Sequence, residues 1–463
     1  MSGKNRAIPT ELGTENIGKL LKQYALPAII AQTASSLYNM VDSIFIGQGV
    51  GSLAISGLAV TFPLMNLSTA FGTLVGAGAA TMLSVLLGQK NYKAANKVLG
   101  NVVSLNIIIG LIFMAVALIF IDPILYFFGA SENTLPYAKE YMKIILYGNV
   151  ITHLYFGLNA AMRSSGNPKK AMGLTIFTVI FNTILDPIFI FVFDMGIAGA
   201  AWATVLAQTV AMMVVLHHFR DRTRPFHFEK GIVSLDMRVA KDSLAIGMGP
   251  FLMNSAACLV TLFINQQLRE YSGDLGIGAY GITNRFGFMF IMICMGLNQG
   301  MQPIAGYNYG ARHYSRVKEV FWKTARLAVL VTTTCFIIGV FMPQIAVGIF
   351  THDPQLSELA SRALRIMMLV FPIVGFQMIS TNFFQSLGMV KKSVILSLSR
   401  QILFLLPLIY ALPKRYGADG VWMSFPISDV LATLMTIYML GRLFRKFNKL
   451  NDGDDPSILG GQI

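Results

Sequence analysis

Charged residues are scarce in this sequence. Asp, Glu, Lys and Arg make up 13% of its 463 residues, whereas hydrophobic residues make up 54%. A soluble domain carries about 25% charged residues, so a chain of this composition lacks the polar surface that water requires. The composition therefore excludes an ordinary soluble protein and indicates a chain that is surrounded mostly by lipid.

Cysteine is also rare. Cys258, Cys294 and Cys335 all lie inside apolar runs and form no CxxC pair. This spacing predicts neither a disulfide framework nor a structural zinc site, and we expect the three thiols to pack as small apolar side chains. The polar first 16 residues have no small-residue cleavage site, so we expect no removable signal peptide.

Sequence signatures of catalysis are missing as well. The chain has no HExxH, GxSxG or P-loop motif and no histidines at metal-ligand spacing. Each of these motifs places a metal, a nucleophile or a phosphate group in a defined local structure. We therefore predict that the protein is not an enzyme and needs no cofactor.

Long apolar runs are abundant. Four examples are residues 102–121, 172–193, 328–349 and 394–413. Each has the length of about 20 residues that a bilayer-spanning helix needs, and none alternates as the strands of a membrane barrel do. Twelve spans are predicted, near residues 18–46, 54–87, 95–121, 137–163, 169–193, 197–219, 243–269, 276–309, 317–342, 356–387, 392–413 and 418–444.

The positive charge of the chain is concentrated in alternate loops. The formal net charge is +14, and Lys and Arg cluster in every second loop, whereas the loops between are neutral or mixed. The basic loops lie near residues 90–97, 163–170, 220–230, 312–318, 391–392 and 442–449, with Lys414 and Arg415 as the main exception. This positive-inside pattern predicts that both termini are cytoplasmic. The charge thus reports topology, and we expect no nucleic-acid partner.

The two halves of the sequence repeat each other. Three loop motifs recur 222 positions later and a fourth recurs 221 positions later: Gly51–Ile55 as Gly273–Ile277, Gly88–Tyr92 as Gly310–Tyr314, Gly166–Lys170 as Gly388–Lys392, and Gly196–Gly199 as Gly417–Gly420. Each half has an even number of spans, so both halves enter the membrane in the same direction. They are parallel repeats, and we expect substrate to bind between them and access to alternate as they rock.

The expected fold class is an all-α integral membrane protein, with twelve transmembrane helices in two six-helix lobes related by pseudo-two-fold symmetry. The expected boundaries are a cytoplasmic segment 1–16, an N-lobe 17–219, an inter-lobe linker 220–241, a C-lobe 242–446 and a cytoplasmic tail 447–463.

Two carboxylates, Asp42 and Asp186, lie inside predicted spans of the N-lobe. A carboxylate at the bilayer centre costs about 2.5–3.5 kcal/mol on insertion scales and marks a functional site by default. Asn182 lies four residues before Asp186, so the two share one helix face. A structural role, in which the acids only cap or pair within the bundle, is the alternative.

Further oxygen ligands are expected beside these acids. Pro187 has no N–H to give to the carbonyl of Thr183, which leaves that oxygen free, and Thr204 supplies a hydroxyl. Such oxygens suit a hard monovalent cation such as Na⁺ at Asp42 and Asp186. Two buried carboxylates close together also favour a proton on one of them, so the residues leave H⁺ and Na⁺ open.

The chain resembles the multidrug and toxic compound extrusion (MATE) family, in its DinF-like and MepA-like prokaryotic branch. The similarity covers about residues 15–445 and rests on the paired six-helix layout and on five motifs: Leu26-Pro27, Tyr38–Gly47, Arg163–Lys169, Asn182–Pro187 and Gly199–Thr204. The resemblance implies a multi-pass protein of a prokaryotic cell membrane that works as a monomer among lipids. It also implies antiport of lipophilic or cationic drugs against H⁺ or Na⁺.

The resemblance also assigns residues. In the DinF-like branch, the positions of Asp42 and Asp186 form an N-lobe cation site. We expect Asn182 and Thr204 to complete this site and Pro27 to act as a helix hinge. Tyr141 either hydrogen-bonds this site or sits in the outer aromatic belt. Tyr38, Asn39, Asn254 and Arg285 are expected to support the site or to line the substrate cavity.

The internal repeat suggests that only one lobe binds the coupling cation. Asn182, Asp186 and Thr204 correspond to Phe404, Leu408 and about Phe425, and Asp42 corresponds to Ile264 or Asn265. The NorM-like branch of the family has acids in helices 7 and 10, where this chain offers Asn254 and Gln377. We therefore expect cation coupling in the N-lobe alone.

The C-lobe has intramembrane charges of its own, Arg285, Arg400 and Asp429. Arg285 and Asp429 lie at similar depth, so we predict that they form an ion pair, because an unpaired charge would be costly there. Alternatively, Arg285 faces the central cavity.

The leading functional prediction is a cation-coupled exporter. The alternative is a flippase for a lipid-linked or amphipathic substrate, which would favour a strongly basic cavity; Asp42 and Asp186 argue against it.

Overall fold

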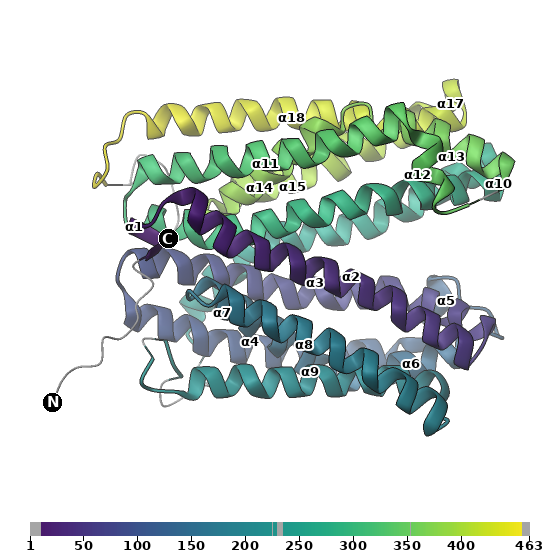
Figure 1. Cartoon of the computed structure of the whole chain (residues 1–463), viewed down its shortest axis with the longest axis horizontal. Helices are drawn as coiled ribbons and strands as arrows, with labels where there is room; N and C mark the ends of the chain where they lie inside the picture. The colour runs from purple at the N-terminus through teal and green to yellow at the C-terminus, as the bar shows by residue number, and fades with distance from the viewer. Residues whose placement is uncertain (1–10, 225, 229–234, 352, 456–463) are drawn as a thin grey trace. The chain divides into compact units, whose positions relative to one another are not determined.

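The computed structural model describes residues 11–224, 226–228, 235–351 and 353–455, and it leaves the side chains of residues 37–40, 52 and 274 undescribed. Within the described ranges the regular structure is helical, with no strand (Figure 1).

The helices of the first half are α1 (Glu11–Thr14), α2 (Ile17–Gly49), α3 (Ser52–Gly88), α4 (Tyr92–Ile119), α5 (Ile121–Phe127), α6 (Leu135–Tyr147), α7 (Asn149–Ser164), α8 (Pro168–Pro187), the π-helix η1 (Ile188–Val192) and α9 (Gly196–Arg220). Those of the second half are α10 (Met237–Gly310), α11 (Tyr314–Phe341), α12 (Pro343–Gly348), α13 (Pro354–Met367), α14 (Phe371–Ser386), α15 (Val390–Leu398), the π-helix η2 (Ser399–Leu405), α16 (Leu406–Ala411), α17 (Pro413–Tyr416) and α18 (Ala418–Phe447).

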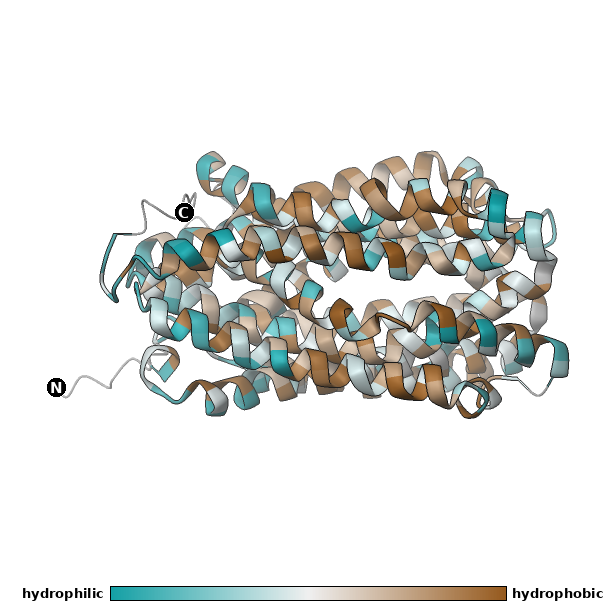
Figure 2. Ribbon diagram, turned by 90° about the horizontal axis from the view of Figure 1, so that it is seen from above, coloured by the Kyte–Doolittle hydropathy of each residue, from teal (hydrophilic) through white to brown (hydrophobic). Residues whose placement is uncertain are grey.

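These helices have the length and composition of membrane spans. Among the described residues, 9 helices are long and apolar enough to cross a bilayer, and the pair α13 and α14, bent by 56°, brings the number to 10. The two remaining spans of the expected twelve correspond to α2 and to α6 with α7. Apolar residues fill the middle of the helices and polar residues gather at their ends (Figure 2). The all-α membrane fold class predicted from the sequence is confirmed.

The repeat is visible in the backbone. The matched glycines Gly51 and Gly273 have positive φ angles of 114° and 62°, and so do Gly166 and Gly388, at 92° and 69°. The non-glycine residues Lys90 and Arg312, also 222 positions apart, share a φ near 60°, at 58° and 61°. Positive φ suits glycine because it lacks a Cβ, so the recurring motifs mark equivalent helix ends.

Two of the long helices are shared between two compact units. Among the described residues, unit 1 comprises residues 11–14 and Ile30–Phe251, and unit 2 comprises Glu15–Ile29 and residues 252–455. The first boundary falls inside α2, two residues after Pro27, and the second falls inside α10, one residue after Pro250. The lobe boundaries expected from the sequence stay a prediction, and the two compact units differ from them in the first parts of α2 and α10, up to Ile29 and Phe251.

The first part of α2, up to Ile29, and the first part of α10, up to Phe251, each cross another helix of their unit at a glycine. In unit 2, a Cβ on Gly300 would lie 2.5 Å from the Cα of Ala25, and a Cβ on Gly296 would lie 2.5 Å from Ile29 Cγ1. In unit 1, a Cβ on Gly78 would collide with the Ser243 carbonyl, and one on Gly247 with the Leu74 carbonyl. Small residues of this kind let membrane helices approach to backbone contact.

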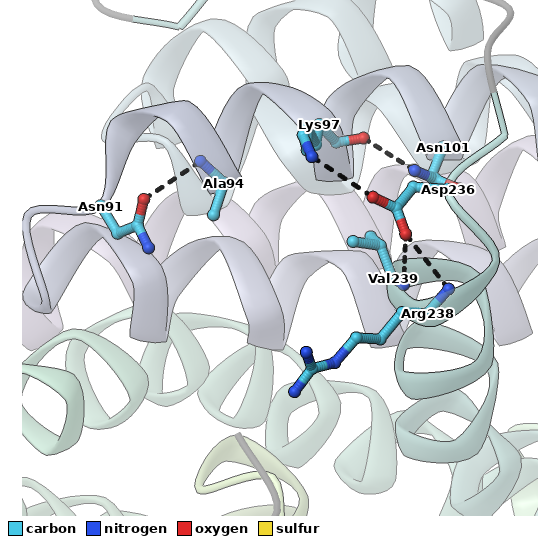
Figure 3. A network of polar contacts seen from close by, with 7 residues as sticks. All are labelled: Asn91, Ala94, Lys97, Asn101, Asp236, Arg238 and Val239. Carbon is cyan, nitrogen blue, oxygen red and sulfur yellow. Dashed lines mark hydrogen bonds and ion pairs between the residues drawn. The ribbon is translucent and has the colours of Figure 1, made fainter.

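The start of α10 is fastened to α4 within unit 1. Asp236 caps α10 by accepting hydrogen bonds from the N–H groups of Arg238 at 3.1 Å and Val239 at 3.4 Å, and its other oxygen lies 3.4 Å from Lys97 Nζ (Figure 3). The end of the linker is thereby held on the N-lobe side of the chain.

Candidate functional site

The candidate coupling residues come together from four helices of unit 1. Asp42 lies on α2, Tyr141 on α6, Asn182 and Asp186 on α8, and Thr204 on α9. All five side chains are buried, with exposed fractions of 5%, 1%, 2%, 0% and 7%. Asn182 and Asp186 are four residues apart on α8, so they lie on one helix face and face the same neighbours.

Polar contacts link these residues. Asn182 Nδ2 donates a hydrogen bond to Asp186 Oδ1 at 2.8 Å. The Tyr141 hydroxyl is hydrogen-bonded to Thr204 and is close enough to both carboxylates to interact with them electrostatically. Asp42 and Asp186 also interact with each other. The residues therefore form one cluster, and Tyr141 belongs to it rather than to an aromatic belt.

Each carboxylate keeps one oxygen without a donor. Asp42 Oδ1 and Asp186 Oδ2 are buried and have no hydrogen-bond partner among the described residues. An unpaired buried acceptor costs about 1–3 kcal/mol, and more if it is charged. Two such oxygens in one cluster fit a species that brings positive charge or a hydrogen, which is a monovalent cation or a proton.

The described residues contain no group of three or more His, Cys, Asp or Glu side chains that could hold a metal ion. A pair of carboxylates with amide and hydroxyl oxygens is too weak a ligand set for a transition metal and suits Na⁺. The donors present thus fit the expected Na⁺ as well as H⁺.

The backbone changes its helical pitch next to the cluster. Pro187 ends α8, and the chain continues as η1, a π-helix. A proline removes one hydrogen bond from the helix ladder, and short π-helical turns are frequent at functional sites. The free carbonyl expected at Thr183 stays a prediction.

The equivalent region of unit 2 is apolar. Phe425 packs against a buried hydrophobic cluster that includes Leu405, Ile409 and Trp422. Gln377 is buried with an unpartnered Oε1, and Asn254 is half-buried. The cluster of two acids and their partners therefore has no counterpart at these positions.

The ion pair predicted between Arg285 and Asp429 is wrong. Asp429 on α18 pairs with Arg400 on η2, with Oδ1 2.5 Å from Nε. Arg285 is exposed and makes no ion pair with Asp429 in the described part of the chain. Depth along a helix was the only basis for the prediction, and it carries no information on the direction in which a side chain points.

The structure describes the remaining predicted residues, Pro27, Tyr38 and Asn39, mainly by their position on α2. Pro27 lies inside α2, which continues through it. Tyr38 and Asn39 belong to α2, but their side chains lie outside the described residues.

A second polar cluster of unit 1 was missed by sequence reasoning. It consists of Ser68, Asn106, Asn149 and His153, all buried. The signal that could have found it is the internal repeat, because the positions 222 residues later are Phe290, Ala328, Phe371 and Gly375.

Comparison with known proteins places the chain among transporters. The profile of the MatE family matches residues 27–188 and 246–411. The multidrug export protein MepA of Staphylococcus aureus (strain MRSA252) is 28% identical over 432 residues, which cover 91% of this chain and 94% of that protein. MepA of Staphylococcus haemolyticus is 27% identical over 425 residues, which cover 92% and 93%.

Solved structures agree with this comparison. The MATE multidrug transporter DinF-BH, solved in complex with R6G, is 34% identical and superimposes with a TM-score of 0.88 over 97% of this chain and 100% of that one. A MATE protein in a bent conformation has a TM-score of 0.89 over 95% and 98% of the two chains, at 22% identity, which supports the fold alone.

Proposed function

Because the chain belongs to the MatE family, we propose that it is a secondary active multidrug exporter that antiports lipophilic or cationic organic compounds against H⁺ or Na⁺ by alternating access. The relatives named above are multidrug export proteins, so a role in transport rather than catalysis follows from the family. The coupling ion and the kind of substrate are the finer parts of the proposal.

The observation that carries the coupling proposal is the pair of unpaired carboxylate oxygens, Asp42 Oδ1 and Asp186 Oδ2, inside unit 1. A buried acid without a donor is costly unless something fills its place during the working cycle. When bound, the cation supplies the positive charge that neutralises these oxygens.

The neighbouring residues would hold the two acids in position. The Asn182 amide N–H donates a hydrogen bond to Asp186 Oδ1, which leaves Oδ2 of the same carboxylate as the unpaired oxygen. The Tyr141 and Thr204 hydroxyls bond to each other, and they offer oxygens to Na⁺ or hydrogens to a carboxylate. Tyr38 and Asn39 are proposed as supporting residues because they lie within one turn of Asp42 on α2.

Cation binding must alter substrate affinity to drive export, because a ligand shifts an equilibrium only by its differential affinity for two states. We place that change in α2. Pro27 weakens this helix at the point where it leaves unit 2, and Asp42 lies beyond that point in unit 1. Movement of α2 about Pro27 would link the cation site to the substrate site.

The proposal places the protein in a prokaryotic cell membrane, as a monomer with both termini in the cytoplasm. The basic loops support this orientation through the positive-inside rule.

Efflux of the dye R6G from proteoliposomes that contain the purified full-length chain tests the function. R6G is a suitable probe because it was bound by the similar transporter DinF-BH. We expect efflux when a Na⁺ or H⁺ gradient is imposed, and none when neither gradient is present. Dye movement that ignores both gradients would contradict antiport, and complete inactivity toward lipophilic cations would favour the flippase alternative.

A further inference from the structure

The second polar cluster of unit 1 lies where three helices meet. Ser68 comes from α3, Asn106 from α4, and Asn149 and His153 from α7. Their exposed fractions are 6%, 0%, 1% and 0%. His153 is therefore a fully buried titratable group that the proposed coupling site does not use.

Hydrogen bonds fix the state of the His153 ring. Its Nε2 lies 2.9 Å from the Ser68 carbonyl oxygen. A carbonyl can only accept, so Nε2 carries the hydrogen, and in the neutral ring Nδ1 then has a bare lone pair. The Ser68 hydroxyl donates to Asn149 Oδ1 at 2.5 Å, and Asn149 Nδ2 donates to the Gly110 carbonyl at 3.1 Å. These bonds hold the ring from one side.

The other side of the cluster has two acceptors and no donor. His153 Nδ1 and Asn106 Oδ1 are both buried without a hydrogen-bond partner among the described residues. Asn106 Nδ2 donates to the Val102 carbonyl at 2.8 Å, which fixes the amide orientation because a second acceptor could not face that carbonyl. Two unpaired acceptors are complementary to a hydrogen, and a proton on Nδ1 would turn one of them into a donor.

Glycines bring the two side chains to the same helix contact. Gly110 follows Asn106 by one turn on α4, and a Cβ there would lie 3.5 Å from His153 Nδ1. Gly157 follows His153 by one turn on α7, and a Cβ there would collide with Asn106 Nδ2. Each polar side chain thus lies against the glycine of the opposite helix.

The repeat shows that the fold does not need this polarity. The equivalent crossing in unit 2 joins α11 and α14, where Gly375 takes the place of His153 and Ala328 that of Asn106. There, a Cβ on Gly375 would lie 2.6 Å from Thr332 Oγ1 and 2.7 Å from the Ala328 carbonyl. The crossing is closed by small residues, so packing alone does not account for a histidine and three polar partners in unit 1.

We propose that His153 is a second proton-binding group of unit 1, and that the Asn106 amide, unpaired at Oδ1 in this structure, turns to accept a hydrogen bond from the protonated Nδ1. The neutral ring takes a proton from hydronium and releases water, and the new Nδ1–H donates to Asn106 while Nε2–H keeps its bond to Ser68. The groups facing the ring are uncharged: Ser68 and Gly72 from α3, Gly110 and Phe113 from α4, and Asn149 from α7.

Polar contacts continue from this cluster toward the candidate coupling site. Thr152, next to His153, donates a short hydrogen bond to Gln208 Oε1. Gln208 lies one turn from Thr204 on α9, and Thr204 bonds to Tyr141. A part for the His153 proton in transport rests on the proposed function, whereas proton binding by itself does not.

Nuclear magnetic resonance of the full-length chain, labelled with ¹⁵N in its histidine rings and held in lipid nanodiscs, tests the proposal. The sequence has six histidines, and the His153 signal is the one missing in His153→Gln. We expect this signal to pass from the neutral Nε2–H form to the doubly protonated form between about pH 8 and pH 4.

Asn106→Leu is the matched variant, because leucine has nearly the shape of asparagine but cannot accept a hydrogen bond. We expect it to fold and to lower the proton affinity of His153 about tenfold, which is about one pH unit in the midpoint. A His153 ring that stays neutral across the whole range would overturn the proposal and leave a site filled only by water. An unchanged midpoint in Asn106→Leu would remove Asn106 as the acceptor. Neither readout depends on dye export, so the proposed function can fail while this proposal stands.

Discussion

At the scale of single residues, an unpaired polar atom inside the membrane indicates a candidate binding site, because lipid offers it no hydrogen-bond partner. The buried acids Asp42 and Asp186 of unit 1 leave two oxygens unpaired, whereas the buried acid Asp429 of unit 2 is paired with Arg400. The first arrangement leaves two acceptors without a donor, and in the second a side chain supplies the donor. The two halves therefore differ in the polar contacts that they bury, although their loop motifs repeat.

The Arg400–Asp429 pair yields a stability prediction. The Asp429 side chain is 4% exposed and that of Arg400 is 23% exposed. Asp429→Leu leaves a largely buried guanidinium without its partner, and we expect a loss of about 3 kcal/mol. The double variant Arg400→Met with Asp429→Leu should regain most of this loss, because neither charge is then buried. Thermal unfolding in detergent measures both.

A surface pair is the control for that prediction. Arg362 and Asp419 form an ion pair whose side chains are 65% and 30% exposed. Arg362→Met should cost less than about 1 kcal/mol, as exposed pairs do. Equal losses in the two single variants would mean that burial of the Arg400–Asp429 pair has no special weight.

At the scale of helices, close crossings at glycine set the position of the first parts of α2 and α10. We expect Gly300→Ala to destabilise unit 2 by about 1–3 kcal/mol, the usual range for overpacking, because the new Cβ would meet the backbone of Ala25 at 2.5 Å. Gly441→Ala on α18 is the matched control, because a Cβ there meets nothing within 4 Å. Alanine is favoured over glycine in a helix by about 1 kcal/mol, so the control should unfold at the same or a higher temperature. If both variants unfold like the wild type, the crossing is not tight.

The first turn of α10 gives a prediction with a pH dependence. The hydrogen bond from the Val239 N–H, with smaller effects of Lys97 and the Arg238 N–H, lowers the pKa of Asp236 from its ordinary value of 3.8. A carboxylate with a lowered pKa stabilises the folded state fully above its ordinary pKa, and this contribution is lost as the pH falls through the lowered value. The anchor in Figure 3 should therefore hold at neutral pH and weaken below about pH 4.

Hydrogen–deuterium exchange of the first turns of α10, corrected for intrinsic rates, checks this anchor. At neutral pH we expect faster exchange in Asp236→Ala, and a smaller increase in Asp236→Asn, because asparagine still caps a helix. The first turn of α11 serves as the internal reference, because its Ser315 N–H donates to Asp452 and not to Asp236. Equal exchange in wild type and Asp236→Ala at neutral pH would show that the cap does not hold this turn.

At the scale of the whole molecule, the sequence was sufficient for the fold class and for the repeat. Apolar runs of membrane-spanning length and glycine motifs 222 positions apart are local signals, and the helices and their positive-φ ends follow them. Asp42 and Asp186 could be selected because they are acids inside predicted spans, and the repeat showed that Asn182 and Asp186 correspond to the apolar Phe404 and Leu408 in the other half.

Other features depended on spatial information that one sequence does not hold. The partner of Asp429 is set by the direction of side chains around a helix, and η2 alters that direction locally. The division of α2 between two units depends on contacts of Ala25 and Ile29 with residues far along the chain. The His153 cluster joins three helices whose polar residues are unremarkable one by one.

The central claim is that cation coupling resides at Asp42 and Asp186 in unit 1, and gradient-driven R6G efflux by Asp186→Asn tests it most directly. The control is Asp194→Asn, an exposed aspartate of the same unit at a positive φ of 52°, which asparagine tolerates. We predict that Asp186→Asn folds but loses the acceleration by the Na⁺ or H⁺ gradient at least about tenfold, as expected for an essential buried charge, while the control exports like the wild type. Gradient-driven efflux that persists in Asp186→Asn would contradict the account and place coupling elsewhere in the chain.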